Sequence, residues 1–395
     1  MNNKKIVVTG MGVIVPKAKN TEEFSEMLQK GTCGLSIVEN VGPNGESVVG
    51  GIIEEEYMTI DGKNYKRYPK FSRISIASAE EAVKMAKINK DFPKRTTVVA
   101  FTSTGGIKDV GFCQDLVSTK ELRRYPIHAT ALGNNHSIAT GVASHFGIQH
   151  QAFTINDSCN AAMDALFMAK MLLESHQTDM VILTGAETPI SEVMVYSFNK
   201  TRNVLYNQTI DEVGNPFSSN SKGFAMSEGA GTIILEREDD ALKRDATIQG
   251  SIKRVALSFD SVSILQSDQT GEILYRAVEE ACREDVPDFV NSQALGLTEN
   301  DTIEQRNYHK KFDGKVPITT IKGHVGQALG AVGMIQIVSS LLSMKDGFIP
   351  PTIRTDKQGY EELPIVLETD YRDVSSVLVT CHGFGGNNGC VFLEK

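Results

Sequence analysis

The sequence has few cysteines, and none lies in the spacing of a metal site or a redox pair. They are scattered along 395 residues without a CxxC pair, and no histidine stands at a zinc-finger spacing from any of them. We therefore expect neither a disulfide framework nor structural zinc, and most of the cysteines should be small buried hydrophobic residues. The six are Cys33, Cys113, Cys159, Cys282, Cys381 and Cys390.

Long hydrophobic runs are also missing. No segment approaches the roughly 20 uninterrupted apolar residues of a membrane-spanning helix. The opening MNNKKIVVTGMG passes from two lysines into a short apolar run, without the longer apolar core and cleavage site of a signal peptide. We therefore expect a cytoplasmic protein.

Basic residues are outnumbered by acidic ones. The net charge of −9 argues against general nucleic-acid binding, which needs a basic surface. One basic cluster in KNYKRYPKFSR could dock an acidic partner, although such a run is more often a solvated face. Its members are Lys63, Lys66, Arg67, Lys70 and Arg73.

Short β-rich runs alternate with longer segments of helical period, which predicts an α/β fold with buried, mostly parallel strands and helices outside. The predicted strands are KIVVTG, TTVVAFTST, QAFTIN, DMVILTGAE and GTIILE, and the predicted helices include AAMDALFMAKMLLESH and ILYRAVEEACRED.

The C-terminal part contains one more helix and a strand pair. The run VGMIQIVSSLLSMKDGFIPPT should form a helix that ends at Gly347 before Pro350 and Pro351. A strand pair is expected around the glycine-rich turn of SSVLVTCHGFGGNNGCVFLEK. No Pro/Ser-rich linker is present, and the best division falls after ILEREDDALKRDA, giving halves of residues 1–245 and 246–395.

Cys159 differs from the other cysteines in its context. It lies in TINDSCNAAMDALFMAK, where a predicted strand ends and an amphipathic helix begins. Unpaired backbone N–H groups and the positive end of the helix dipole favour thiolate over thiol at such a turn. The same N–H groups suit a developing oxyanion. The alternatives at Cys159 are therefore a reactive thiol and a buried structural cysteine.

Six motifs in order along almost the whole chain resemble those of the β-ketoacyl synthase family. Any one glycine-rich fragment is weak evidence, and the shared order is what makes the resemblance specific. The motifs are VVTGMGVIVP, NNHSIATGVASHFGIQHQAFTINDSCNAAMDA, LTGAE, PFSSNSKGFAMSEGAGTIILE, GHVGQALGAVG and GFGGNN.

The resemblance implies a thiolase-like fold, in which two related βαβ-type halves form a five-layered α-β-α-β-α arrangement. It implies that Cys159 accepts an acyl group from the phosphopantetheine of an acyl carrier protein. Two histidines of the family then help malonyl-carrier to lose carbon dioxide and stabilise the enolate and the oxyanion. No metal or other cofactor is implied.

One of the two family histidines is missing. His324 in IKGHVGQ matches the second histidine, with a loop-filling role as the simpler alternative. The first belongs to an HGTGT-type segment that reads VNSQALGLTENDTIE here, so Gln293 stands at its position, and Asp301 and Glu304 match the acidic pair that follows. A glutamine amide can donate a hydrogen bond to an oxyanion, but it carries no positive charge and exchanges no proton near neutral pH.

Further departures surround this position. Leu295 and Leu297 replace two threonines with which the family binds the pantetheine arm, and we expect them to narrow the entrance or pack against it. Thr319 stands at the family's active-site lysine, whereas Lys322 is displaced by three residues and is not assigned that role.

The GFGG motif resembles the family's gating loop. Phe384 matches the phenylalanine that moves to admit substrate, and its glycine neighbours allow unusual dihedral angles. His382 replaces another phenylalanine, and it either interacts with Cys159 or only fills space.

Two main functions remain open. The first is the non-elongating chain-length factor of a ketosynthase heterodimer in polyketide or fatty-acid-type assembly. The second is a specialised synthase, homodimeric or not, that acylates Cys159 and passes the acyl group on. An ordinary condensing enzyme fits least, because several catalytic positions have changed. In each case the expected partners are another ketosynthase subunit and an acyl carrier protein.

Overall fold

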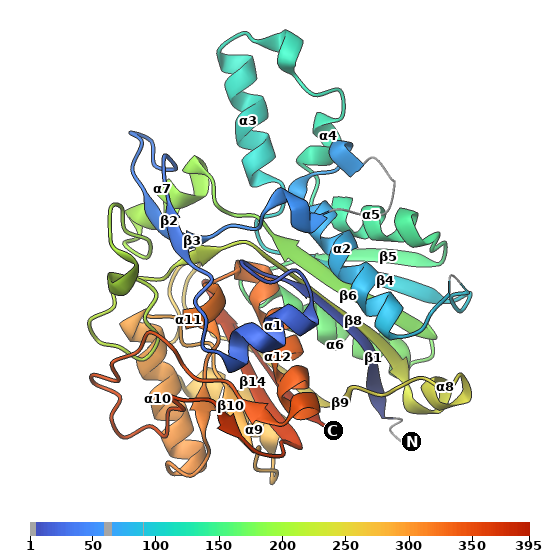
Figure 1. Cartoon of the computed structure of the whole chain (residues 1–395), viewed down its shortest axis with the longest axis vertical. Coiled ribbons are helices and arrows are strands. Elements are labelled where there is room, and N and C mark those ends of the chain that lie inside the picture. The colour runs from blue at the N-terminus through green and yellow to red at the C-terminus, as the bar shows by residue number, and fades with distance from the viewer. Residues whose placement is uncertain (1–4, 59–64, 90) are drawn as a thin grey trace.

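A single ten-stranded sheet runs through the protein, and it is described here from a computed structural model covering residues 5–58, 65–89 and 91–395 (Figure 1). The strand order is β11-β10-β14-β15-β9-β1-β8-β6-β4-β5. The strands of this sheet are β1 (Ile6–Ile14), β4 (Thr96–Thr102), β5 (Gln151–Asn156), β6 (Met180–Glu187), β8 (Gly229–Arg237), β9 (Gly250–Phe259), β10 (Phe289–Asn291), β11 (Ile318–Thr319), β14 (Ser376–Gly383) and β15 (Asn387–Glu394).

The two ends of this sheet repeat one topology. In the first unit β1 pairs with β8 and β8 with β6 in antiparallel fashion, while β6, β4 and β5 are parallel. The second unit has the same pattern in β9, β15, β14, β10 and β11, taken in the same chain order. The predicted division into residues 1–245 and 246–395 falls between β8 and β9.

Helices complete five layers. One pair covers the outer face of the first unit, one pair lies between the units, and one pair covers the outer face of the second unit. These three pairs are α2 (Lys70–Met85) with α5 (Ser137–Phe146), α6 (Ala161–Glu174) with α12 (Val332–Asp346), and α9 (Glu272–Cys282) with α10 (Thr298–Phe312).

The remaining elements are short or peripheral. The other helices are α1 (Thr21–Gln29), α3 (Ile107–Ser118), α4 (Ala129–Leu132), α7 (Glu192–Lys200), α8 (Glu238–Lys243) and α11 (Lys322–Val325). A small three-stranded sheet contains β2 (Ser36–Val38), β3 (Val48–Gly51) and β7 (Met226–Ser227), and β12 (Phe348–Ile349) pairs with β13 (Asp370–Tyr371). Helix α3 projects from the body of the protein (Figure 1).

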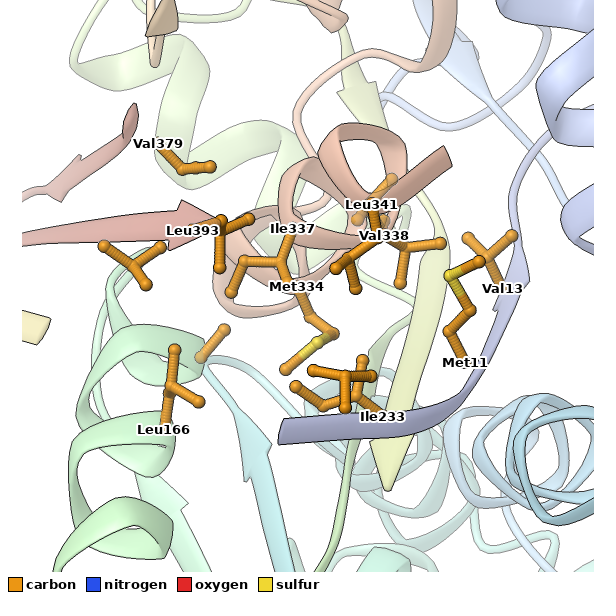
Figure 2. Packing of buried hydrophobic residues seen from close by; sticks show 14 of the residues in the cluster. Met11, Val13, Leu166, Ile233, Met334, Ile337, Val338, Leu341, Val379 and Leu393 are labelled. Carbon is orange, nitrogen blue, oxygen red and sulfur yellow. The ribbon is translucent and has the colours of Figure 1, made fainter. Parts of the chain in front are cut away.

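Successive side chains of each strand face different helical layers, so the sheet is buried on both faces. In β4, Val98 packs with the outer helices α2 and α5, whereas Val99 packs with the central helices, as expected for successive side chains on opposite faces. In β14, Val379 faces the central layer and Leu378 the outer helices α9 and α10. Figure 2 shows side chains of the central layer, with Ile233 from β8 close to Met334 from α12.

Most predicted elements and the five-layered thiolase-like arrangement are confirmed, but the expectation of mostly parallel strands is wrong. The five predicted strands correspond to β1, β4, β5, β6 and β8, and Gly347 ends α12 in a left-handed conformation with φ of 72°. The sheet is parallel only toward its edges and antiparallel across its middle. Helices α6 and α12 fill the layer between the units, which is the central helical layer of the five-layered arrangement that the resemblance implied.

Two further expectations concern the cysteines and membrane-spanning helices. All six cysteines are free; five are buried and Cys33 is half-buried. Among the helices of the described residues, none is both long enough and apolar enough to cross a bilayer.

The central layer should dominate stability. Ile233 is fully buried there, so Ile233→Ala should lower the free energy of unfolding by about 2–5 kcal/mol through lost burial and a cavity. The control is Leu242→Ala in α8, where the side chain is 61% exposed and the change should stay within about 0.5 kcal/mol. Urea unfolding of both variants tests this, and equal losses would contradict it.

Candidate functional site

Cys159 lies at a turn from strand to helix, as the sequence predicted. Strand β5 ends at Asn156 and α6 begins at Ala161, with Asn160 as its N-cap residue. The end of β14 passes so close that a Cβ on Gly383 would lie 2.8 Å from the backbone nitrogen of Cys159. Glycine at this position is therefore a steric requirement of the site.

The prediction of a thiol biased toward thiolate is wrong for this conformation. Cys159 is 5% exposed, and burial, the largest effect, raises the pKa of its thiol to about 11. The buried Glu187 adds to the rise, while hydrogen bonding with Ser158 lowers the pKa. Desolvation outweighs the hydrogen bonds that favour the thiolate, so the thiol is protonated near neutral pH.

His324 lies in α11, which follows β11 in the second unit as the Cys159 turn follows β5 in the first. Its side chain is fully buried, and neither ring nitrogen has a hydrogen-bond partner among the described residues. Burial lowers the pKa of His324 to about 3, so the imidazole is neutral at physiological pH. A neutral ring can donate a hydrogen bond, but it supplies no positive charge.

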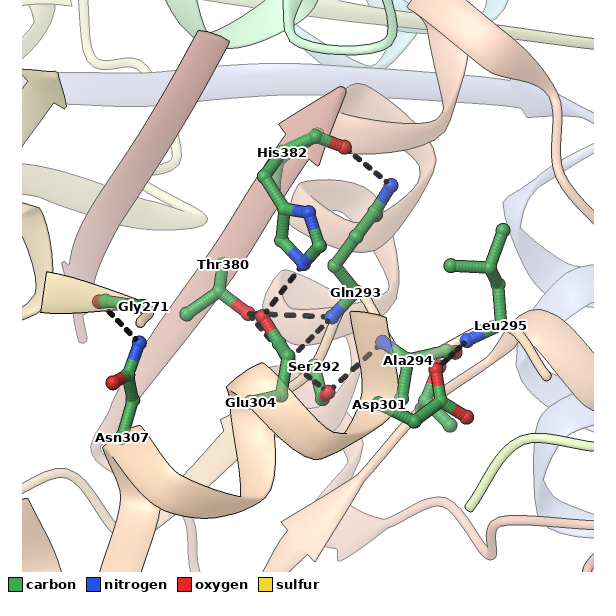
Figure 3. Close-up of polar contacts among 12 residues, drawn as sticks. Gly271, Ser292, Gln293, Ala294, Leu295, Asp301, Glu304, Asn307, Thr380 and His382 are labelled. Carbon is green, nitrogen blue, oxygen red and sulfur yellow. Dashed lines mark hydrogen bonds and ion pairs between the residues drawn. The ribbon is translucent and has the colours of Figure 1, made fainter. Parts of the chain in front are cut away.

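Gln293 follows the end of β10 and is fully buried. Its Nε2 donates to the backbone oxygen of His382 over 3.1 Å, which Figure 3 shows. Its Oε1 accepts from Nζ of Lys322 over 2.9 Å. The missing histidine is thus replaced by an amide whose two polar atoms are both engaged.

The strand end before Gln293 is fixed by α12. Nδ2 of Asn291 donates to Oγ of Ser339 over 2.8 Å and to Oγ of Ser340 over 3.1 Å. Nε2 of Gln336 donates to the backbone oxygen of Ser292 over 3.0 Å. These buried bonds leave Gln293 little freedom.

Two buried carboxyl groups hold the loop after Gln293. Asp301 accepts from the backbone nitrogens of Leu295 and Gly296 over 3.0 and 3.1 Å, and burial raises its pKa to about 7. Glu304 accepts from the backbone nitrogen of Gln293 over 3.1 Å. Burial alone would raise the pKa of Glu304, but His382 and nearby hydroxyl donors hold it below its usual value.

A cavity of 490 Å³ reaches Cys159. Its wall includes most of the residues that the sequence assigned to the entrance and the gate. These are Leu295, Leu297, His382 and Phe384, together with Gln293 itself.

His382 has a partner that the sequence did not suggest. Its Nε2 lies 3.3 Å from Oε1 of Glu304, and its backbone oxygen holds Gln293. Both side chains of the pair are almost completely buried. His382 therefore forms part of the cavity wall and contacts the carboxyl group of Glu304, rather than only filling space.

Two predicted site residues lie away from the cavity. Oγ1 of Thr319 donates to the backbone oxygen of Pro350 over 2.6 Å, and Thr319 is not part of the cavity wall. His324 is also absent from the cavity wall.

Two members of the basic cluster form ion pairs within the fold. Lys70 forms an ion pair of 2.6 Å with the buried Glu228, and Arg73 pairs with Glu55 at 2.7 Å. Lys63 lies outside the described residues, and Arg67 is exposed. At least two members of the cluster therefore have structural roles.

Two family models together match most of the chain. The model described as "Beta-ketoacyl synthase, N-terminal domain" matches residues 3–241, and "Beta-ketoacyl synthase, C-terminal domain" matches residues 223–356. The chain belongs to the β-ketoacyl synthase family.

Relatives match the chain over its full length. It is 26% identical to the "Putative polyketide beta-ketoacyl synthase 1" of Streptomyces cyaneus, covering 99% of this chain and 98% of the relative. It is 27% identical to the "3-oxoacyl-[acyl-carrier-protein] synthase 2" of Staphylococcus aureus (strain COL), covering 100% and 99%. A solved structure described as "The ishigamide ketosynthase/chain length factor" has a TM-score of 0.89 at 21% identity, covering 100% and 99%.

Sequence reasoning missed Lys322 as a contact of Gln293. The shift of three residues from Thr319 was expected to point Lys322 elsewhere on a strand or a turn, but β11 ends at Thr319 and a helical turn begins at Lys322, whose Nζ reaches Gln293. The only sequence signal was a lysine close to His324 in a synthase that lacks its expected lysine.

The raised thiol pKa predicts the pH dependence of alkylation. Because only the thiolate reacts, the rate at Cys159 should increase by roughly tenfold per pH unit from pH 7 to 10. Iodoacetamide labelling followed by peptide mass mapping measures the rate, and Cys159→Ser gives the baseline. A plateau below pH 9 would show that the thiol is activated.

Proposed function

We propose that this β-ketoacyl synthase is a non-elongating subunit of polyketide or fatty-acid-type chain assembly, acting as the chain-length-factor partner of a complete ketosynthase. The observation that carries the proposal is the Gln293 amide, held between Lys322 and the backbone oxygen of His382. An amide in this position cannot exchange a proton during decarboxylation.

The other groups near Gln293 do not replace the lost function. His324 is buried and neutral, and the thiol of Cys159 is protonated near pH 7. Leu295 and Leu297 line the cavity without hydroxyl groups to bind a pantetheine arm. These features support a subunit that does not extend a chain by itself.

A large apolar surface supports a protein partner. Strand β5 is an edge of the main sheet, and α3 projects with a connected turn whose hydrophobic side chains are exposed (Figure 1). Exposed hydrophobic side chains that gather on one segment are typical of interaction sites in soluble proteins. The exposed residues of the projecting segment are Val110, Phe112, Val117, Leu122, Tyr125 and Ile127. A ketosynthase subunit is the proposed occupant, in line with the description of the ishigamide structure.

A second candidate function is acyl transfer through Cys159. The observation in its favour is that the thiol lines a cavity of 490 Å³. The Cys159 sulfur would lose its proton and bond to the carbonyl carbon of a carrier thioester. The bond from that carbon to the carrier sulfur would break, and the departing thiolate would take up a proton. This exchange needs no decarboxylation and no cofactor.

Partner binding can be tested at α3. We expect the chain to copurify with a ketosynthase encoded in the same gene neighbourhood, and Phe112→Asp to abolish copurification by placing a charge in the apolar surface. The matched control is Leu242→Asp in α8, which is also exposed but lies at another part of the sheet. A chain that never copurifies and elongates as a homodimer would refute the proposal.

Restoring the missing histidine should not restore elongation. In Gln293→His, the new ring would face the buried Lys322 and a cavity still lined by Leu295 and Leu297. We expect no measurable release of carbon dioxide from malonyl-carrier, measured with a radiolabelled carboxyl group. Robust release from this single variant would show that the neighbouring residues matter little.

A further inference from the structure

The contact between Lys322 and Gln293 fixes which way the amide points. An ammonium only donates hydrogen bonds and an amide oxygen only accepts them, so Oε1 must face Lys322. The backbone oxygen of His382 only accepts, so Nε2 must face His382. A flipped amide would lose both bonds in a fully buried position, which is costly.

The fixed amide has one N–H group to spare. Nε2 carries two hydrogens. Among the described residues, the acceptor of its hydrogen bond is the backbone oxygen of His382. Gln293 lines the cavity together with Cys159, whereas Lys322 is 1% exposed and does not line it. Lys322 can therefore influence a molecule in the cavity only through Gln293 or through its electric field.

We propose that Lys322 is a positioning residue, which holds and polarises the Gln293 amide so that its free N–H donates to the carbonyl oxygen of a thioester at Cys159. The inference rests on the second candidate function, acyl transfer. During the exchange the carbonyl oxygen gains negative charge as the Cys159 sulfur bonds to the carbonyl carbon. The carbonyl group forms again when the pantetheine sulfur leaves and takes up a proton. A donor fixed before the reaction stabilises that charge without reorganisation.

The charge of Lys322 supports this role. Burial lowers its pKa to about 8, so the ammonium form still predominates at pH 7. The acidic groups Glu304 and Asp301 and the thiols of Cys381 and Cys159 act in the opposite direction on that pKa. A buried ammonium bonded to Oε1 draws electron density from the amide and makes its N–H groups better donors.

A double-mutant cycle tests the inference with a defined thioester. The variants are Lys322→Met, Gln293→Leu and the double variant, and the probe is octanoyl-pantetheine with intact-mass detection of the adduct on Cys159. Each single variant should slow acylation at pH 7 by at least about tenfold, and by up to the roughly 10²–10³-fold that is typical of a lost oxyanion donor. The double variant should be no slower than Gln293→Leu, because Lys322 acts through the amide.

Two controls separate positioning from structural damage. Iodoacetamide forms no oxyanion, so its rate at Cys159 should fall much less than the acylation rate. Lys345→Met, at an exposed lysine near the end of α12, should change neither rate. If Lys322→Met does not fold, comparison of Gln293→Leu with the double variant still decides, because the double variant leaves no unpaired amide oxygen.

The outcomes distinguish this inference from the functions on which it rests. Additive effects in the cycle, or equal losses with both reagents, would overturn the role of Lys322 while leaving acyl transfer intact. No octanoyl adduct on the wild-type chain would overturn both this inference and acyl transfer, and it would leave the heterodimer proposal standing.

Discussion

The architecture depends on enclosing two helices between two sets of strands. Helices α6 and α12 fill the layer between the units, and α12 is buried along almost its whole length. A helix that is buried around its circumference needs cover on every side, and the repeated strand topology supplies it. Polar chemistry is then confined largely to the turns that lead into these helices. Cys159 precedes α6 and His324 precedes α12 at corresponding points of the two units.

Desolvation governs the chemistry at those turns. It keeps the thiol of Cys159 protonated and His324 neutral near pH 7. Lys322 keeps its charge at pH 7 beside an amide oxygen. The site therefore supports hydrogen-bond donation more readily than proton exchange. This balance agrees with an amide, rather than an imidazole, at position 293.

The sequence was sufficient for elements with a strong period and insufficient for their pairing. Short, nearly continuous apolar runs such as those of β4 and β6 identify strands, because a strand buried on both faces needs apolar side chains on both faces. Strands β10 and β11 have three and two residues, which is too short for a pattern. The antiparallel middle of the sheet was missed because periodicity reports burial and not the identity of the neighbouring strand.

Within the site, motif order located Cys159, Gln293 and the cavity residues Leu295 and Leu297. The contact from Lys322 to Gln293 was not predictable by counting residues, because the chain changes from strand to helical turn between Thr319 and Lys322. The thiol pKa was misjudged because the helix terminus can be read from the sequence, whereas the depth of burial depends on segments far apart in the chain.

The projecting helix α3 has a practical consequence for the life of the protein in a cell. Ile127, in the segment that follows α3, is 99% exposed, and exposed apolar surface of this kind promotes non-specific association until a partner covers it. If the proposed ketosynthase subunit covers this surface, a chain synthesised in excess of that subunit would be recognised by chaperones and proteases. Its abundance would then follow that of the proposed subunit, because unpaired copies would be degraded.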